Sequence, residues 1–264
     1  MKKSNDVKSE NNENLTISKK LKDTLKPTNT DKTKLVVNSI ISSVLAGFAT
    51  ATGNTPLAVG SSLNVFSNII GFPMGKRLAE TMLSLAEKLE TLEKNVVGFK
   101  IENLVNNELF TTTILQALQI AVRNHQKEKI DALHNAVLNT AIGNTPDEDL
   151  QLMFLHNIDS LTSWHLKILS YFRDPQGWFQ IRNKKIPDVS GGAGYGLEIA
   201  FPELGDKTEF YSQIVDELIT KGFMKKGNYL NVTMSSSGVY ATRTTDIGDK
   251  FLTFISSPLD EIEN

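Results

Sequence analysis

The chain has 264 residues, which is enough for two ordinary domains or for one domain with appended segments. Its 28 Lys and Arg residues nearly balance its 30 Asp and Glu residues, so the chain as a whole lacks the basic excess of a nucleic-acid-binding protein. Because it contains no cysteine, disulfides, thiolate nucleophiles and thiolate metal sites are excluded.

The first segment, residues 1–34, is basic and polar. It carries nine Lys against five Asp and Glu residues and has no aromatic residue. A segment of this composition cannot bury enough apolar surface to offset its chain entropy. The sequence therefore predicts a disordered basic tail.

The next segment, residues 35–75, contains no charged residue. A turn at Thr52-Gly-Asn-Thr-Pro56 divides it, and we expect two helices over about 35–51 and 56–72. Each would be roughly 25 Å long at 1.5 Å per residue. Uncharged polar side chains recur near helical spacing on one side of each helix, and these candidates for lining a pore are Ser39, Ser43, Thr50, Ser61, Asn64 and Asn68.

Two interpretations of this hydrophobic helical hairpin remain open. Lys34 precedes it and Lys76 follows it, so the positive-inside bias favours insertion from the cytoplasmic side of a bacterial inner membrane. Insertion would be permanent, or would follow a trigger from a cytoplasmic resting state. The alternative is a buried hairpin inside a soluble bundle, since the small residues also allow close helix packing.

Residues 76–160 are predicted to form a helical oligomerisation or bundle region. Further helices are expected over about 101–107, 109–124, 126–142 and 147–158. The first helix has apolar residues that alternate at spacings of four and three, which indicates a heptad seam. Such a seam is typical of a subunit contact in a homo-oligomer and nearly as often of a contact within one chain. The seam residues are Leu78, Met82, Leu85, Leu89, Leu92 and Val96.

No catalytic or metal-binding constellation stands out in the chain. His125 and His134 lie in polar helical surroundings, so we expect both to be solvated. His156 and His165 lack the spacing of a helix-borne metal pair. We therefore expect a non-enzymatic protein without catalytic residues, bound metal or cofactor.

Residues 161–264 are predicted to form an α+β domain. Helices are expected over about 163–172, 195–201, 207–221 and 246–256, with a β-hairpin of 230–234 and 239–244 between the last two. This order is that of a winged-helix domain. The run VYATRTTDIGDKFLTFI, residues 239–255, resembles the segment from the wing to the last helix in many bacterial winged-helix proteins.

Charge decides which ligands this winged-helix-like domain would accept. The helix at 207–221 bears Glu209, Asp216 and Glu217, a poor match to a phosphate backbone. The glycine run 190–196 lacks the context of a phosphate loop and is interpreted as a flexible connection. Local basic and aromatic residues would suit a short single strand or a nucleotide, and these candidates are Arg182, Lys184, Lys185, Tyr195, Lys225, Lys226, Tyr229 and Arg243.

The order of parts is similar to that of anti-phage membrane-channel effectors of the Hailong type: small-residue hydrophobic hairpin, Glu/Lys/Leu-rich helix, helical bundle and winged-helix-like end. The resemblance implies a channel that is controlled by an oligonucleotide made by a partner nucleotidyltransferase. We thus expect a non-enzymatic membrane effector, an oligomeric pore gated through its soluble part by a ligand or a partner protein. The alternatives are a soluble winged-helix DNA-binding regulator and a protein-interaction adaptor.

Overall fold

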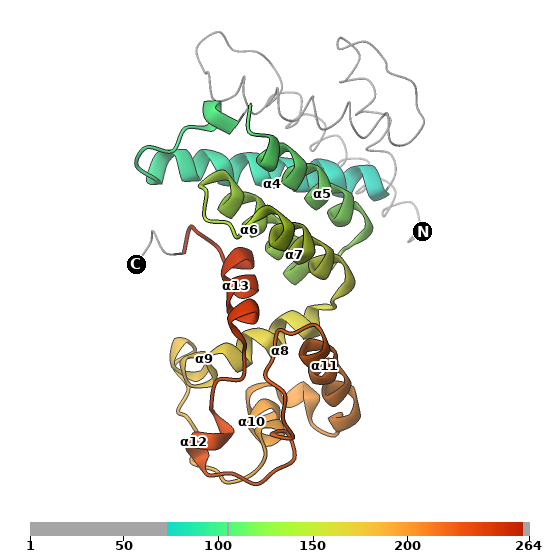
Figure 1. Cartoon of the computed structure of the whole chain (residues 1–264), viewed down its shortest axis with the longest axis vertical. Helices are drawn as coiled ribbons and strands as arrows, with labels where there is room; N and C mark the ends of the chain where they lie inside the picture. Colours follow the sequence, from blue (N-terminus) through green and yellow to red (C-terminus); the bar gives the residue numbers. More distant parts are fainter. Residues whose placement is uncertain (1–72, 105, 261–264) are drawn as a thin grey trace, which may run out of the picture. The chain divides into compact units, whose positions relative to one another are not determined.

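A computed structural model describes residues 73–104 and 106–260, and this part of the chain is mainly helical (Figure 1). The tail 1–34 and nearly all of the uncharged segment lie outside the described residues, so the predicted hairpin and its six pore-lining candidates do too. Two compact units divide between Asp159 and Ser160, close to the domain boundary expected at 160/161. Unit 2 ends at Phe254, and the chain from Ile255 belongs to unit 1.

Unit 1 consists of helices whose expected positions were accurate to within a few residues. Helices α4 and α5 pack against each other and both pack against α6. The helix expected at 101–107 is a single 3₁₀ turn, η2 (Ile101–Leu104). The four helices are α4 (Pro73–Asn95), α5 (Glu108–Arg123), α6 (Lys127–Ala141) and α7 (Glu148–Ser160).

The heptad seam of α4 lies in the core of unit 1. Five of its six residues are almost completely buried against helices of the same chain, and Val96 is half-buried. The seam is therefore an intramolecular contact in this structure, which is the alternative that its spacing left open. Self-association of the chain stays a prediction. The exposed fractions are 3% for Leu78, 3% for Met82, 2% for Leu85, 2% for Leu89 and 0% for Leu92.

A buried amide connects three helices of unit 1. The Nε2 group of Gln151 on α7 donates to the hydroxyl oxygen of Thr113 on α5 and to that of Thr140 on α6, the latter at 3.1 Å. Each threonine hydroxyl in turn donates to a carbonyl oxygen one turn earlier in its own helix, at 2.8 Å. The two hydroxyls are paired on both sides, whereas the Oε1 atom of Gln151 is buried without a hydrogen-bond partner. The contact therefore links α7 to α5 and α6 at the cost of one unsatisfied buried acceptor.

The expectation that His134 is solvated is wrong. Its side chain is 4% exposed, and neither ring nitrogen has a hydrogen-bond partner. Burial, together with the charge of the nearby Lys88, lowers the pKa of His134 to about 4, although Asp131 opposes the shift. His125 is exposed, as expected. The polar sequence around His134 concealed its position because the ring faces the bundle on the apolar side of α6.

Unit 2 contains four helices that the sequence indicated and two that it missed, the short α12 (Ser236–Val239) and α9. The longer of the two missed helices is α9, where no helix was expected. Asp174 caps it by accepting from the Gly177 N–H at 2.9 Å, and Pro175 occupies its first position. An Asp-Pro pair is itself a helix-start signal. The helices are α8 (Ser163–Arg173), α9 (Pro175–Ile181), α10 (Ala193–Ala200), α11 (Thr208–Thr220) and α13 (Asp246–Ile255).

The prediction of a β-hairpin at 230–244 is wrong. The residues predicted as its turn begin the short helix α12 (Ser236–Val239), and residues 73–104 and 106–260 contain isolated β-bridges but no strand. Val239 and Tyr240 are neighbours and are both buried, at 0% and 3% exposed. In a β-strand two consecutive side chains point to opposite faces, so they cannot both be buried on one side of the strand. The burial of both residues therefore fits the helical turn seen here and not the predicted strand.

The antiparallel pairing lies further from the turn than the sequence indicated. Met224 and Thr244 form an isolated bridge, where Lys225 N–H donates to Arg243 O at 2.8 Å and Thr245 N–H donates to Phe223 O at 3.0 Å. We call the segment that this bridge closes, residues 225–243, the wing loop.

The glycine run before α10 is closely packed, so its interpretation as a flexible connection is wrong. A Cβ atom on Gly192 would lie 2.0 Å from the carbonyl oxygen of Leu230, and one on Gly196 would lie 2.7 Å from Cγ1 of Val239. The N–H of Ala193 donates to Tyr229 O at 2.8 Å. The glycines are required because the start of α10 touches the backbone of the wing loop directly.

Candidate ligand-binding surfaces

The core of unit 2 is a cluster of aromatic rings that reaches the surface at two tryptophans. Tyr171 lies fully buried at its centre, in edge-on contact with Trp178 and Phe201 at 6.0 Å between ring centroids in each case. Trp164 and Trp178 lie 5.7 Å and 5.1 Å from Phe201. Both tryptophans are half-buried, and they are the only two in the chain. This cluster therefore presents aromatic edges to solvent.

Cationic side chains cover the exposed parts of these rings. The guanidinium carbon of Arg182 lies 4.2 Å from the ring centroid of Trp178, and the Lys184 ammonium lies 5.3 Å from it. The Lys167 ammonium lies 5.2 Å from the Trp164 centroid. Each such contact contributes about 0.5–1 kcal/mol at an exposed site. Two predicted ligand-binding residues thus meet at one ring, and Lys185 follows them as an exposed cation.

The C-terminus of α9 fixes this arrangement. Asn183 adopts a left-handed conformation with φ of 52°, its N–H donates to Gln180 O at 2.9 Å, and the Lys184 N–H donates to Phe179 O at 2.9 Å. These two bonds form a Schellman motif, in which the chain reverses sharply after the last helical turn. The reversal leaves Ile181 82% exposed at the tip.

Arg243, another candidate, is engaged within the wing loop. Its guanidinium lies 4.9 Å from the ring of Tyr229, and its Nη2 donates to the carbonyl oxygen of Gly238 at 2.8 Å. Tyr229 is 7% exposed, its hydroxyl is buried without a hydrogen-bond partner, and burial raises its pKa to about 12. These two side chains hold the loop in shape. The remaining candidates Lys225 and Lys226 are exposed on it.

Tyr195 differs from Tyr229 in lying on the surface. It projects from α10 with 49% of its area exposed, and its ring lies against the glycine run, where a Cβ on Gly191 would be 3.5 Å from its Cδ1. Tyr195 therefore remains accessible to a ligand. None of the predicted ligand-binding Lys and Arg residues forms a hydrogen bond or a cation–π contact with it in the structure.

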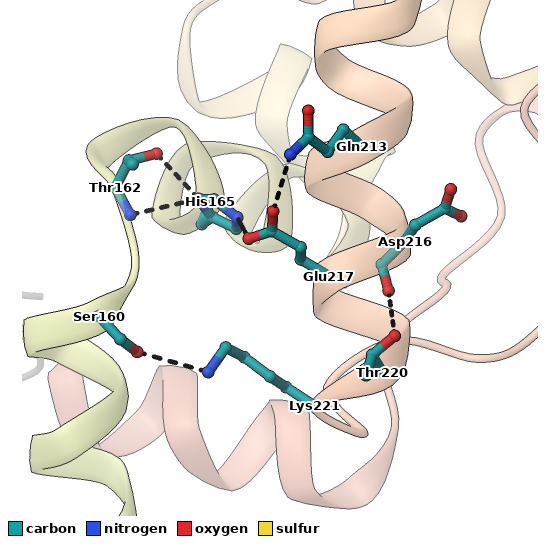
Figure 2. A network of polar contacts seen from close by, with 8 residues as sticks. All are labelled: Ser160, Thr162, His165, Gln213, Asp216, Glu217, Thr220 and Lys221. Carbon is teal, nitrogen blue, oxygen red and sulfur yellow. Dashed lines mark hydrogen bonds and ion pairs between the residues drawn. The ribbon is translucent and has the colours of Figure 1, made fainter.

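A polar network joins the start of α8 to α11, as Figure 2 shows. Nε2 of His165 lies 2.9 Å from a carboxylate oxygen of Glu217, and the amide of Gln213 donates to the other carboxylate oxygen at 3.2 Å. One turn further along α11, Lys221 donates to the hydroxyl of Ser160 at 3.4 Å. Polar groups at this end of α11 are therefore used inside unit 2.

The hydrogen bonds fix the tautomer of His165. The backbone N–H of Thr162 donates to Nδ1 at 3.2 Å, so Nδ1 carries no hydrogen and Nε2 donates to Glu217. Burial lowers the pKa of His165, although the hydrogen bond to Glu217 opposes the shift. An imidazolium could not accept at Nδ1, so the neutral form is the one this geometry holds. The sequence signal that was missed is Thr-x-x-His, which places His165 at the third position of a capped helix.

The outer face of α11 is acidic. Glu209 and Asp216 are exposed there, together with Phe210 at 43%. Like charges facing the phosphates would oppose binding of this helix to duplex nucleic acid. The structure therefore gives duplex binding by α11 no electrostatic support.

Two further observations concern the candidate sites as a group. No cluster of three His, Asp or Glu residues that would hold a metal ion occurs among residues 73–104 and 106–260. In the same part of the chain, no helix has both the length and the apolar character needed to cross a bilayer.

Comparison of the chain with protein-family models, with curated proteins and with solved structures finds no match. The resemblances to winged-helix proteins and to Hailong-type effectors therefore depend only on the residues and the order of parts given above.

Proposed function

We propose that the chain is a non-enzymatic membrane-acting effector that forms an oligomeric pore or ion channel in bacterial defence against phage. The observation that carries this proposal is the run of uncharged residues at 35–75, flanked by Lys34 and Lys76. A polar face made of Ser, Thr and Asn alone suits a narrow water-filled path or close helix contacts in lipid. A soluble surface helix would normally carry Lys and Glu there.

Unit 2 is proposed to be a winged-helix-like domain that gates this pore. Apart from the additional helix α9, the order α8, α10, α11, bridge, wing loop and α13 supports the assignment, because a winged-helix domain also closes its wing between the third helix and the last element. The bridge at Met224 and Thr244 takes the place of the wing's two strands. Gating then requires that a ligand or a partner protein bind one state of the protein more tightly than the other.

The wing loop is the proposed contact for that ligand. Lys225 and Lys226 are exposed on it, whereas the acidic face of α11 would repel phosphate. We infer an anionic ligand, a nucleotide or short oligonucleotide, or else an acidic partner protein. Replacing both lysines with Gln should abolish gating without changing the unfolding of unit 2, because neither ammonium group is needed for the fold.

The localisation test is fractionation of the full-length chain beside a version that lacks residues 1–75. We expect only the full-length chain to stay in membranes after a carbonate wash. If it stays there without any stimulus, the pore element is permanently inserted. If both versions remain soluble in unstimulated and in phage-infected cells, the membrane-acting function is refuted.

The pore-lining assignment has its own test. Replacing Ser43 and Asn64 with Leu should abolish conductance in planar bilayers, because two polar groups leave the proposed lining. The matched control replaces Val44 and Leu63, on the apolar side, with Ile and Met. Tryptophan fluorescence should show unit 2 folded in every variant. Conductance equal to that of the parent in the Leu variant would contradict the assignment.

A soluble winged-helix DNA-binding regulator is the second candidate, favoured by the same order of elements in unit 2. It predicts that the full-length chain stays soluble without detergent. It also predicts specific duplex binding whose affinity falls steeply with salt concentration. The acidic residues Glu209 and Asp216 on α11 count against it.

A further inference from the structure

The tip of α9 combines an exposed apolar side chain with aromatic and cationic neighbours. Ile181 is 82% exposed, and Trp178 is half-buried one turn earlier. Arg182, Lys184 and Lys185 follow directly and are all exposed. Residues 175–187 contain no Asp or Glu, so no carboxylate of this segment neutralises the three cations. We call residues 178–185 the α9 tip.

The shape of this tip is fixed before any partner binds. Asp174 caps the start of α9, and the Schellman motif centred on Asn183 ends it. The ring of Trp178 is held by edge-on contacts to Phe179 and Tyr171, at 5.0 Å and 6.0 Å. A contact made through such a preorganised tip loses little conformational entropy on binding.

This combination matches the surface of an anionic bilayer. Tryptophan rings prefer the boundary between headgroups and acyl chains, basic side chains pair with anionic headgroups, and an apolar side chain at the tip enters the acyl region. We propose that the α9 tip is a peripheral contact for anionic lipid, with Ile181 inserted, Trp178 at the headgroup level and the three cations on lipid phosphates. The inference goes beyond the proposed pore and does not require that residues 35–75 enter the membrane.

The geometry favours lipid over nucleic acid at this place. A nucleobase that stacks on a tryptophan needs an open ring face, but Arg182 already covers Trp178 at 4.2 Å. Base stacking also gives no role to Ile181, the most exposed part of the tip. Lipid accounts for the apolar, aromatic and cationic residues together.

The two tryptophans, both in unit 2, make the test specific. In the full-length variant Trp164→Phe, Trp178 is the only tryptophan, so its fluorescence reports the α9 tip and not residues 35–75. The probe is a vesicle of equal parts phosphatidylglycerol and phosphatidylcholine with brominated acyl chains, which quench a tryptophan only at close range. We expect quenching on these vesicles, and little on phosphatidylcholine alone.

Variants of the tip should weaken this quenching. Near an anionic surface each basic side chain contributes about fivefold to binding, so replacing all three cations with Gln should raise the lipid concentration at half-maximal quenching about 100-fold. Ile181→Ser should raise it about tenfold or more, because the apolar insertion is lost. The matched control is Ile247→Ser, since Ile247 of α13 is also exposed, at 42%, and should have no effect.

Sedimentation with the same vesicles separates this inference from the proposed pore. If the protein sediments with the vesicles and Trp178 is not quenched, the lipid contact of the α9 tip is refuted, although the pore proposal stands. If Trp178 is quenched and carbonate extracts the chain from the membranes of both unstimulated and phage-infected cells, the lipid contact stands and the pore proposal falls. The lipid assignment would be overturned if a short single-stranded oligonucleotide quenched Trp178 and the vesicles did not, and if Ile181→Ser left the quenching by the oligonucleotide unchanged.

Discussion

Replacing His134 with Leu should make unit 1 more stable and less sensitive to acid. Both ring nitrogens of His134 are buried without a hydrogen-bond partner, and such groups cost about 1–3 kcal/mol. Leucine has a similar volume and no polar atom. We therefore expect a free energy of unfolding for unit 1 that is about 1–3 kcal/mol higher at pH 7.5 than in the parent protein.

The pH dependence follows from the lowered pKa. The pKa of His134 is about 4 in the folded protein, below an unfolded value of 6.5, so the unfolded chain binds a proton more readily. Stability is then fully present above pH 6.5 and is lost as the pH falls through 6.5 toward 4. By proton linkage the loss is roughly 1 kcal/mol at pH 5.5 and roughly 2–3 kcal/mol at pH 4.5. His134→Leu should remove this loss.

The assay uses the position of the tryptophans. Both lie in unit 2, so fluorescence follows the urea unfolding of unit 2, while far-UV circular dichroism follows the helices of both units. A transition seen by circular dichroism alone reports unit 1. His125→Leu, at an exposed position, is the matched control and should keep the acid sensitivity of the parent. If His134→Leu loses as much stability between pH 7.5 and 4.5 as the parent does, His134 does not cause the acid sensitivity.

Two further substitutions test unit 2, with tryptophan fluorescence during urea unfolding as the readout. Gly192→Ala should lower its free energy of unfolding by about 1–3 kcal/mol, because the new Cβ would lie 2.0 Å from Leu230 O. Gly191→Ala is the control, since its Cβ would meet only Tyr195 at an ordinary 3.5 Å, and equal effects of the two would contradict the close-packing argument. Glu217→Ala should cost about 1 kcal/mol by leaving the Nε2–H of His165 without its acceptor. Asp216→Ala is the control, since it removes the same charge from the neighbouring residue, and it should change the free energy of unfolding by less than about 0.5 kcal/mol. If Asp216→Ala costs as much as Glu217→Ala, the charge of the helix causes the effect and not the hydrogen bond.

The helices of unit 1 were predictable because one physical signal dominates them. Apolar residues at helical spacing must face a core, so α5 and α6 appear within one or two residues of their expected bounds. The same periodicity does not say which surface covers the apolar side. The seam of α4 looked like a subunit contact for this reason, and only the packing of α5 and α6 on it shows an intramolecular core.

The wing loop was not predictable because local alternation and tertiary packing disagree there. Leu230-Asn-Val-Thr-Met234 alternates as a strand does, but Met234 pairs with Gly191 from a distant part of the chain. That pairing depends on the absence of side chains in the glycine run, a property that sequence reasoning interpreted as flexibility. A glycine needed for close approach and a glycine in a loose linker look the same in sequence.

The candidate binding residues show why composition alone cannot assign a site. Arg182 and Arg243 were singled out for the same reason, a cation with an aromatic residue nearby. In the structure Arg243 donates a hydrogen bond to Gly238 O inside the wing loop. Replacing Arg243 would therefore disturb the structure of the loop in addition to any effect on ligand binding. Arg182 makes contacts of the same kinds, since its Nη1 donates to Trp178 O at 3.0 Å and its guanidinium carbon lies 4.2 Å from the Trp178 ring centroid, but it lies on an exposed tip beside Ile181. What separates the two cations is exposure, since Arg243 is half-buried in the wing loop and Arg182 is exposed on the α9 tip, and the spacing of residues in the sequence does not show this difference.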